Sequence, residues 1–493
     1  MAKTIFKSSE KSNFILNMTE DQYAKLATFG LLTALFAVPL ANIIPEMQKT
    51  VTYSASAVGL AISGVLCMIL AMIALIKKYV NGSIILPAVL FAGILGWGTV
   101  SLYNGYDRTV GFYGFPQRGE GLLAIIFYFC FFITAASIKR KKAVNTLLIA
   151  LSALGAVNSI FSIIQITTKE FIYYSYTDIA VSVQTIAPDG MSQSPIFLSM
   201  VLCLSLAASL TLSASHENKI IRIGASISAA LSGFVMIFTR TLAGWCGLIL
   251  GILAGIIALF ASKKPKTRLL SVAAVIAAAG LSFGICATVK SGDYNGYHLF
   301  DGNILWEDDA FQRASASGLY NPKSVEIDDT YDVYTYINEK TMKIIKDNKL
   351  YGTGPEQLVY PQLYTYGYRS AKSSISDIAT VNVGTFDKVY NEYLYTAATR
   401  GVPSLILLIG LLLLTAASAY KKFRKGGDIN DTAVFLILIC GILMFFITCS
   451  NITYSPVFWT FAGLACAQFS GKNENTSKEI KADKKNNKAV SNK

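Results

Sequence analysis

Residues 385–425 read TFDKVYNEYLYTAATRGVPSLILLIGLLLLTAASAYKKFRK, and they contain a change from polar to apolar sequence that decides how the chain folds. Asp387 has the side chain of a helix N-cap, so we expect a helix to begin at Lys388. Gly401 is suited to end that helix, and Pro403 is suited to open the next one. The apolar run that follows is long enough to cross a bilayer. The stretch therefore predicts a polar helix joined to a membrane-spanning helix.

Similar apolar runs occur throughout the chain. It has 493 residues, of which 53% are hydrophobic and 15% are charged, and a soluble protein of this size would need more polar surface. We therefore expect an all-α integral membrane protein. Windows of about 19 residues predict about twelve spans, at 26–44, 57–76, 84–103, 121–138, 143–166, 194–212, 222–239, 241–262, 269–288, 402–420, 432–449 and 456–470.

These spans divide the chain into five parts. We expect a cytoplasmic tail (1–25), transmembrane helices one to nine (26–288), a large loop (289–401), helices ten to twelve (402–470) and a disordered basic tail (471–493). The large loop is the candidate active-site region, because it is the long polar segment of an otherwise apolar chain. It is expected to be partly helical, with one helix at TYINEKTMKIIKDNK that ends near Gly352.

The distribution of Lys and Arg predicts the orientation. Basic clusters such as Lys139–Lys142 and Lys421–Lys425 alternate with loops that hold few basic residues. Basic loops stay in the cytoplasm, so both termini are expected there and the large loop is expected outside. The formal net charge of +13 is then a signal of topology, and nucleic-acid binding is not indicated.

The residue types that usually bind metals are scarce. The chain has two histidines, His216 and His298, and its eight cysteines all fall inside apolar runs, where they are expected to be buried small hydrophobes. No carboxylate motif has metal-ligand spacing. We therefore expect neither a metal nor a cofactor.

Two arginines are expected near the outer membrane surface. Arg118 lies in DRTVGFYGFPQRGEG, which is either an interfacial segment with aromatic residues or a place where a guanidinium holds phosphate. Arg240 lies in FTRTLAGW between two spans, where it either contacts lipid headgroups or binds an anion.

Three of the chain's segments carry a resemblance to a known family: TRTLAG around Arg240, KIIKDNKLYGTGPEQL before position 359, and DKVYNEYLYTAATRGVPSL from Asp387. Together with the many spans and one large late loop, they resemble the O-antigen ligase and polymerase family. The resemblance implies transfer of a glycan from undecaprenyl pyrophosphate to an acceptor sugar outside the membrane, with inversion and without a metal. In that family, outer-face arginines hold the pyrophosphate and a histidine in the last loop helix is the base.

The carried-over catalytic positions are Arg240, Tyr390 and Asn391. We expect pyrophosphate or glycan to be bound by Arg118, Arg240, Lys388 and Arg400. The sequence departs from the family where His-Asn is replaced by Tyr390-Asn391, and where an Arg-x-x-x-Trp pattern is replaced by Tyr334 and Asn338. A tyrosine with a pKa near 10 stays protonated at neutral pH, so Tyr390 is not expected to be a general base.

We interpret the chain as a glycosyltransferase of the bacterial cytoplasmic membrane that ligates or polymerises a cell-envelope polysaccharide. Its expected partners are a lipid-linked glycan donor, a glycan or glycolipid acceptor, membrane lipids and polysaccharide-assembly proteins. One alternative is a homologue without activity that binds lipid-linked glycan or acts as an assembly scaffold. Another is a lipid-linked oligosaccharide flippase, which the near absence of ionisable residues within the spans disfavours.

The predicted topology can be tested by labelling. In a background without native cysteines, a cysteine at Ser317 should react with an impermeant thiol reagent in intact cells, because the large loop is expected outside. A cysteine at Lys141 should not react. The opposite labelling pattern would reject the outer-face placement of the loop.

Overall fold

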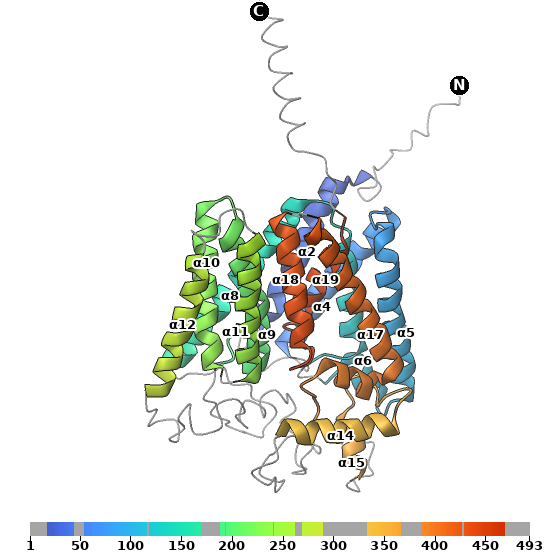
Figure 1. Ribbon diagram of the computed structural model, residues 1–493. Coiled ribbons are helices and arrows are strands. Elements are labelled where there is room, and N and C mark those ends of the chain that lie inside the picture. The colour runs from blue at the N-terminus through green and yellow to red at the C-terminus, as the bar shows by residue number, and fades with distance from the viewer. Residues whose placement is uncertain are drawn as a thin grey trace, which may run out of the picture.

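The computed structural model describes residues 17–43, 54–115, 118–168, 188–192, 194–239, 241–261, 269–288, 333–365, 386–425 and 428–468. In this part of the chain the regular elements are helices, which form one bundle with two further helices beyond one end (Figure 1). The helices are α2 (Glu20–Ala41), α4 (Ala55–Ile76), η1 (Gly82–Ile84), α5 (Ile85–Asn104), α6 (Arg108–Tyr113), α7 (Leu122–Ala136), α8 (Lys141–Thr168), α9 (Pro195–Ser215), α10 (Lys219–Phe238), α11 (Leu242–Ala261), α12 (Leu269–Thr288), α14 (Val333–Asp347), α15 (Val359–Thr365), α17 (Glu392–Arg424), α18 (Ile429–Met444) and α19 (Ser455–Cys466).

Nine helices in the described residues are long and apolar enough to cross a membrane, and they coincide with nine of the expected spans. The other three expected spans contain the shorter apolar helices α7, α18 and α19. α18 ends at Met444, and the chain directly after it bonds to the start of α17. The carbonyl oxygens of Phe445 and Thr448 accept the backbone N–H of Glu392, at 2.9 and 3.2 Å. The twelve expected spans thus correspond to helices of unequal length.

The centre of the bundle is α9, which is buried from Pro195 to Ala214 and packs against α8, α10, α11 and α18. Its closest neighbour, α11, presents three glycines at four-residue spacing. A Cβ at Gly251 would lie 2.4 Å from the Leu206 side chain, and a Cβ at Gly255 would lie 2.5 Å from that of Leu210. Small residues let apolar helices approach closely where no water drives association. We call Gly247, Gly251 and Gly255 with the α9 side chains against them the glycine seam.

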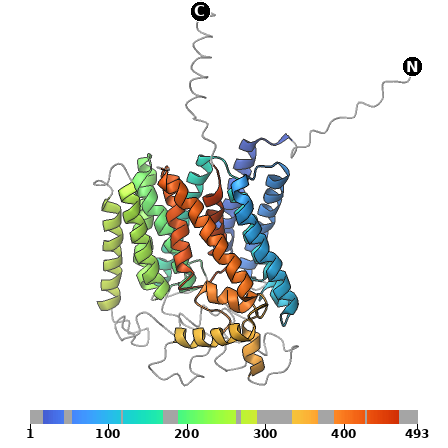
Figure 2. The same ribbon diagram turned by 45° about the vertical axis from the view of Figure 1, so that its right-hand side comes forward.

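The two ends of the bundle differ. α14 and α15 lie beyond the end at which α17 begins, and α14 runs crosswise to the bundle in both views (Figures 1 and 2). The opposite end holds the start of α2, where Glu20 pairs with Lys139 and Asp21 pairs with Arg140. The basic cluster at 139–142, expected in the cytoplasm, therefore lies at the end away from α14.

The expected helix in the large loop is confirmed as α14, and the chain turns at Gly352 with a φ of 69°. The expected start of the next helix was wrong. It begins at Glu392 and not at Lys388, because the Asn391 side chain accepts the backbone N–H groups of Tyr393 and Leu394, at 3.0 and 3.1 Å.

Gly401 interrupts α17, as its sequence context predicts. It has a φ of 79°, and the second section of the helix contains Pro403 and continues to Arg424. At this break the backbone of α17 crosses the turn that follows α14. The Val402 N–H donates to the Lys349 carbonyl at 2.9 Å, and the Gly354 N–H donates to the Thr399 carbonyl at 2.9 Å. These bonds fix the turn against α17.

The crossing leaves no room for a side chain at Gly401. A Cβ there would lie 2.1 Å from the Leu350 carbonyl oxygen, in a left-handed conformation that costs other residues about 1–2 kcal/mol. We expect Gly401→Ala to lower the free energy of unfolding by at least about 2 kcal/mol. Thermal unfolding of the purified protein in detergent measures this change. Gly96→Ala is the control, because a Cβ at Gly96 meets nothing within 4 Å. Equal unfolding temperatures for the two variants would contradict the close crossing.

Candidate functional site

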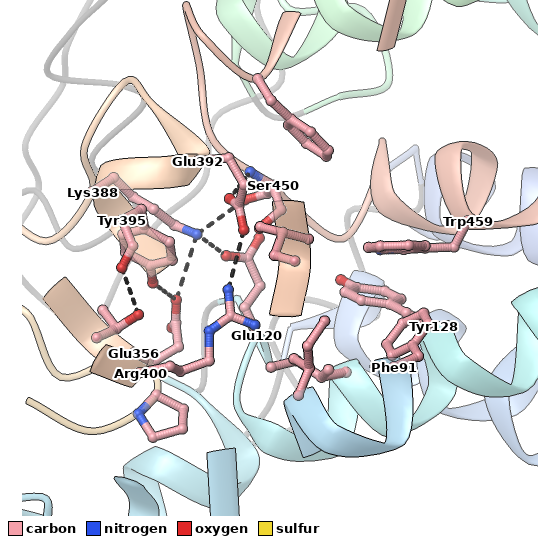
Figure 3. A pocket seen from close by; sticks show the side chains of 16 residues that line it. Phe91, Glu120, Tyr128, Glu356, Lys388, Glu392, Tyr395, Arg400, Ser450 and Trp459 are labelled. Carbon is pink, nitrogen blue, oxygen red and sulfur yellow. Dashed lines mark hydrogen bonds and ion pairs between the residues drawn. The ribbon is translucent and has the colours of Figure 1, made fainter. Parts of the chain in front are cut away.

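A pocket extends from the end of the bundle near α14 into the space between α5, α7, α17 and α19. Figure 3 shows charged side chains on one side of it and the aromatic rings of Phe91, Tyr128 and Trp459 on the other. The cavity measures about 40 Å³, which is room for water or for a single hydroxyl group. The pocket is therefore small, with one ionic wall and one apolar wall.

Glu120 reaches the pocket from a turn rich in glycine. Gly114 and Gly119 have φ values of 84° and 65°, and a Cβ at Gly114 would lie 2.3 Å from the backbone nitrogen of Glu120. The turn therefore requires glycine at Gly114. One carboxylate oxygen of Glu120 accepts the Ile452 N–H at 3.0 Å, and the other pairs with the Lys388 ammonium.

Glu356 comes from the GTGPE turn that follows α14, and it has an unusual φ of 61° for a residue other than glycine. Strained backbone of this kind persists where the surroundings hold it in place. Its Oε1 accepts the Tyr395 hydroxyl at 3.0 Å and lies 3.6 Å from Lys388 Nζ, and its Oε2 lies 3.5 Å from Arg118 Nη2. Burial raises the pKa of Glu356, but the charges of Arg118 and Lys388 outweigh burial, and the net shift is downward.

Lys388 forms ion pairs with two of these carboxylates, Glu120 and Glu356. Besides Glu120 and Glu356, its ammonium contacts the Ser450 carbonyl at 3.1 Å and lies 4.6 Å from the centre of the Tyr395 ring. Burial alone lowers the pKa of Lys388, but the Glu120 charge reverses the shift and raises the pKa well above its ordinary value. Lys388 therefore stays protonated.

Glu392 and Arg400 form a second pair on α17. Arg400 Nη2 lies 3.1 Å from Glu392 Oε1 and donates to the Thr396 hydroxyl at 2.7 Å. The other oxygen of Glu392 accepts the Ser450 N–H at 2.8 Å. This pair ties α17 to the segment between α18 and α19.

Arg118 lies beside the pocket and is only 2% exposed. Its Nη2 is 3.0 Å from Asp387 Oδ2, so Asp387 binds this cation and does not cap a helix as expected. Arg118 Nε and Nη1 are buried and have no hydrogen-bond acceptor in the part of the chain that the structure describes. Buried donors of this kind usually have a partner, so Arg118 keeps the capacity to donate to a further oxygen atom.

The structure thus brings together Arg118, Lys388 and Arg400, three of the residues expected to bind substrate. Tyr390 is 5% exposed, and neither it nor Asn391 is among the described residues that line the pocket. Arg240 lies outside the described residues. Its neighbours Thr239 and Thr241 form a cluster of hydroxyls with Ser199, at distances of 3.0 to 3.2 Å.

Sequence reasoning missed the carboxylates of the pocket, which are Glu120, Glu356 and Glu392 among the described residues. Each of these glutamates lies in a segment that the sequence analysis named. The residues proposed for the site were their basic or aromatic neighbours, and not the glutamates. The pocket's described charges are these three carboxylates and two cations, Lys388 and Arg400. Such a wall suits proton transfer and hydroxyl binding better than the binding of a bare anion.

The contribution of Glu356 can be measured. Glu356→Gln should lower the free energy of unfolding by about 3 kcal/mol, because it removes an anion from two buried cations. Since the folded-state pKa of Glu356 is lowered, its stabilisation is fully present above the ordinary glutamate pKa of about 4.3 and is lost as pH falls through the lower folded value. The difference between the two proteins should therefore shrink in acid.

Thermal unfolding of both proteins as a function of pH checks this prediction. Glu339→Gln on the exposed surface of α14 is the control and should change stability by no more than about 0.5 kcal/mol. If Glu356→Gln behaves like the control at neutral pH, the ion pairs of Glu356 do not stabilise the fold.

Comparison with known proteins agrees with the motifs. Residues 227–409 match the family model described as O-antigen ligase, a region that runs from α10 into the second section of α17. It contains the GTGPE turn and the segment from Asp387 to Arg400. No curated protein matches the chain at a significant level. The family match agrees with the resemblance seen in the sequence, and it shows that residues 227–409 are similar to the O-antigen ligase family.

Proposed function

We propose that this protein transfers a glycan from undecaprenyl pyrophosphate to an acceptor sugar at the outer face of the bacterial cytoplasmic membrane, by ligation or polymerisation. The O-antigen ligase match connects the protein with polysaccharide assembly and with glycosyltransferase-like chemistry in a multi-pass membrane protein. The observation that carries the proposal is that the matched residues 227–409 include the Arg240 segment and four of the charged residues that line the pocket, namely Glu356, Lys388, Glu392 and Arg400.

In the proposed reaction, the acceptor hydroxyl attacks the anomeric carbon as the pyrophosphate leaves. A single displacement of this kind inverts the configuration at that carbon. The leaving pyrophosphate gains negative charge, so cationic donors at its oxygens lower the barrier. We assign this role to Arg240, which stands two positions before the first residue of α11 in the sequence, and to the buried donors of Arg118. These side chains supply positive charge without a metal ion.

Lys388 and Arg400 take a different part in the proposal. Both are already balanced by carboxylates, at Glu120 and Glu392, so a pyrophosphate would have to displace those carboxylates to reach them. We propose that they hold the ionic wall in place for the glycan. The size of the cavity supports this assignment, because the space of about 40 Å³ between the ionic wall and the aromatic rings admits one hydroxyl of the glycan.

A second function, binding of the lipid-linked glycan without transfer, is favoured by one observation. Tyr390 stands where the family has its histidine, and it is buried. A homologue that has lost its base retains the means to bind a glycan and to scaffold an assembly complex.

Deletion and complementation separate the two functions. Deletion of the protein should make lipid-linked repeat units accumulate and should remove the long or attached polymer. Complementation with Tyr390→Phe should restore transfer to within about tenfold, because the hydroxyl is not a base at neutral pH. Arg240→Ala should restore almost none, with normal protein levels. Unchanged lipid-linked pools after deletion would count against the transferase. Full complementation by both variants would favour the scaffold.

A further inference from the structure

The proposed transfer requires a group that takes the proton of the acceptor hydroxyl. The family's histidine is replaced by Tyr390, whose hydroxyl is protonated at neutral pH. Tyr390 is also absent from the described residues that line the pocket. If the proposed function holds, the acceptor of the proton must therefore be found among other residues of this site.

The three carboxylates of the pocket differ in how fully the chain occupies them. Glu392 accepts from Arg400, Thr396 and the Ser450 N–H. Glu356 has four partners in the described residues, namely Tyr395, Lys388, Arg118 and the Phe115 N–H. Glu120 has two, Lys388 and the Ile452 N–H. A carboxylate offers about four acceptor positions, so Glu120, with two partners, has the most capacity left for a ligand hydroxyl.

Glu120 also has the right position. It lies between Lys388 and the aromatic wall in Figure 3, and its side chain is 7% exposed. The cavity of about 40 Å³ admits a single hydroxyl group or a water, but not a sugar ring. An acceptor sugar bound outside this cavity would thus reach the carboxylates with one hydroxyl.

We propose that Glu120 is the general base of the transfer and that Lys388 is its positioning residue. The acceptor O–H bond breaks and its proton binds to the Glu120 carboxylate. The oxygen forms a bond to the anomeric carbon, and the bond from that carbon to the pyrophosphate oxygen breaks with its electron pair. Undecaprenyl pyrophosphate leaves, and Glu120 then releases the proton to water.

The electrostatics of the site agree with this geometry. Burial raises the pKa of the Glu120 carboxyl, and the Lys388 charge offsets this only in part, whereas the pKa of Glu356 is lowered. Two carboxylates whose pKa values are pushed apart by their surroundings are typical of sites that divide acid-base roles. The ionisable groups that face Glu120 are Arg118, Tyr128, Glu356, Lys388, Tyr395 and Cys449.

The test uses purified full-length protein in membrane vesicles from the deletion strain, which contain both lipid-linked donor and acceptor. Glu120→Gln keeps the shape of the side chain and removes the base, so transfer should fall by about 100-fold or more. Glu120→Asp should recover part of it. Glu339→Gln on α14 should transfer at the wild-type rate. Wild-type transfer should decline as pH falls and protonates Glu120, and the residual rate of Glu120→Gln should not follow that decline.

Azide distinguishes a lost base from a damaged site. Azide is an anion without a proton to lose, so its attack on the anomeric carbon needs no base and yields a glycosyl azide. Glu120→Gln should therefore consume donor at near the wild-type rate when azide is added. Transfer by Glu120→Gln within tenfold of wild type would overturn the assignment of the base, as would an inactive variant that azide does not rescue. If the wild-type protein itself transfers nothing, the proposed function fails first.

Discussion

The burial of charge where the loop segments meet the helix bundle is the constraint on which the site depends. Taking an ion out of water costs several kcal/mol unless an opposite charge and hydrogen bonds lie within reach. Here acids and bases from separate segments alternate, so that each carboxylate contacts a cation from another part of the chain or from another turn of its helix. The members in the described residues are Arg118, Glu120, Glu356, Asp387, Lys388, Glu392 and Arg400. Withdrawal of one segment would leave unpaired charge in the others, so the segments must dock as a unit.

Much of the helical architecture could be predicted from sequence, because its determinants are local. A window of apolar residues is enough to predict a span. Gly401 is enough to predict a helix break, because few other residues adopt its backbone conformation. α14 was predictable for the same reason, from its own residues. The lengths of α7 and α18 were not. The carbonyl groups directly after the end of α18, at Phe445 and Thr448, accept the Glu392 N–H, and that contact depends on the position of a different element.

The site could be predicted only in part, since it is made by residues far apart in the sequence. Lys388 and Glu120 are separated by 268 positions, and nothing near either residue specifies the other. The helix start shows the same limit. Asp387 and Asn391 are both good caps by composition, and the choice between them is made by Arg118, which attracts the carboxylate. The sequence singled out three cations that the structure brings together, Arg118, Lys388 and Arg400, but not the carboxylates that neutralise them.

The glycine seam sets a distance that reaches beyond the middle of the bundle. Because Gly247, Gly251 and Gly255 recur every four residues along α11 and lie against side chains of α9, the two helices can interlock only in steps. One step is about 6 Å, at a rise of about 1.5 Å per residue. α11 begins at Leu242, immediately after the hydroxyl cluster of Ser199, Thr239 and Thr241. The glycine seam therefore fixes the position of α11 along the length of α9. Residues with no polar atom in their side chains determine how far along the axis of the bundle α11 begins, and with it the level at which the hydroxyl cluster lies.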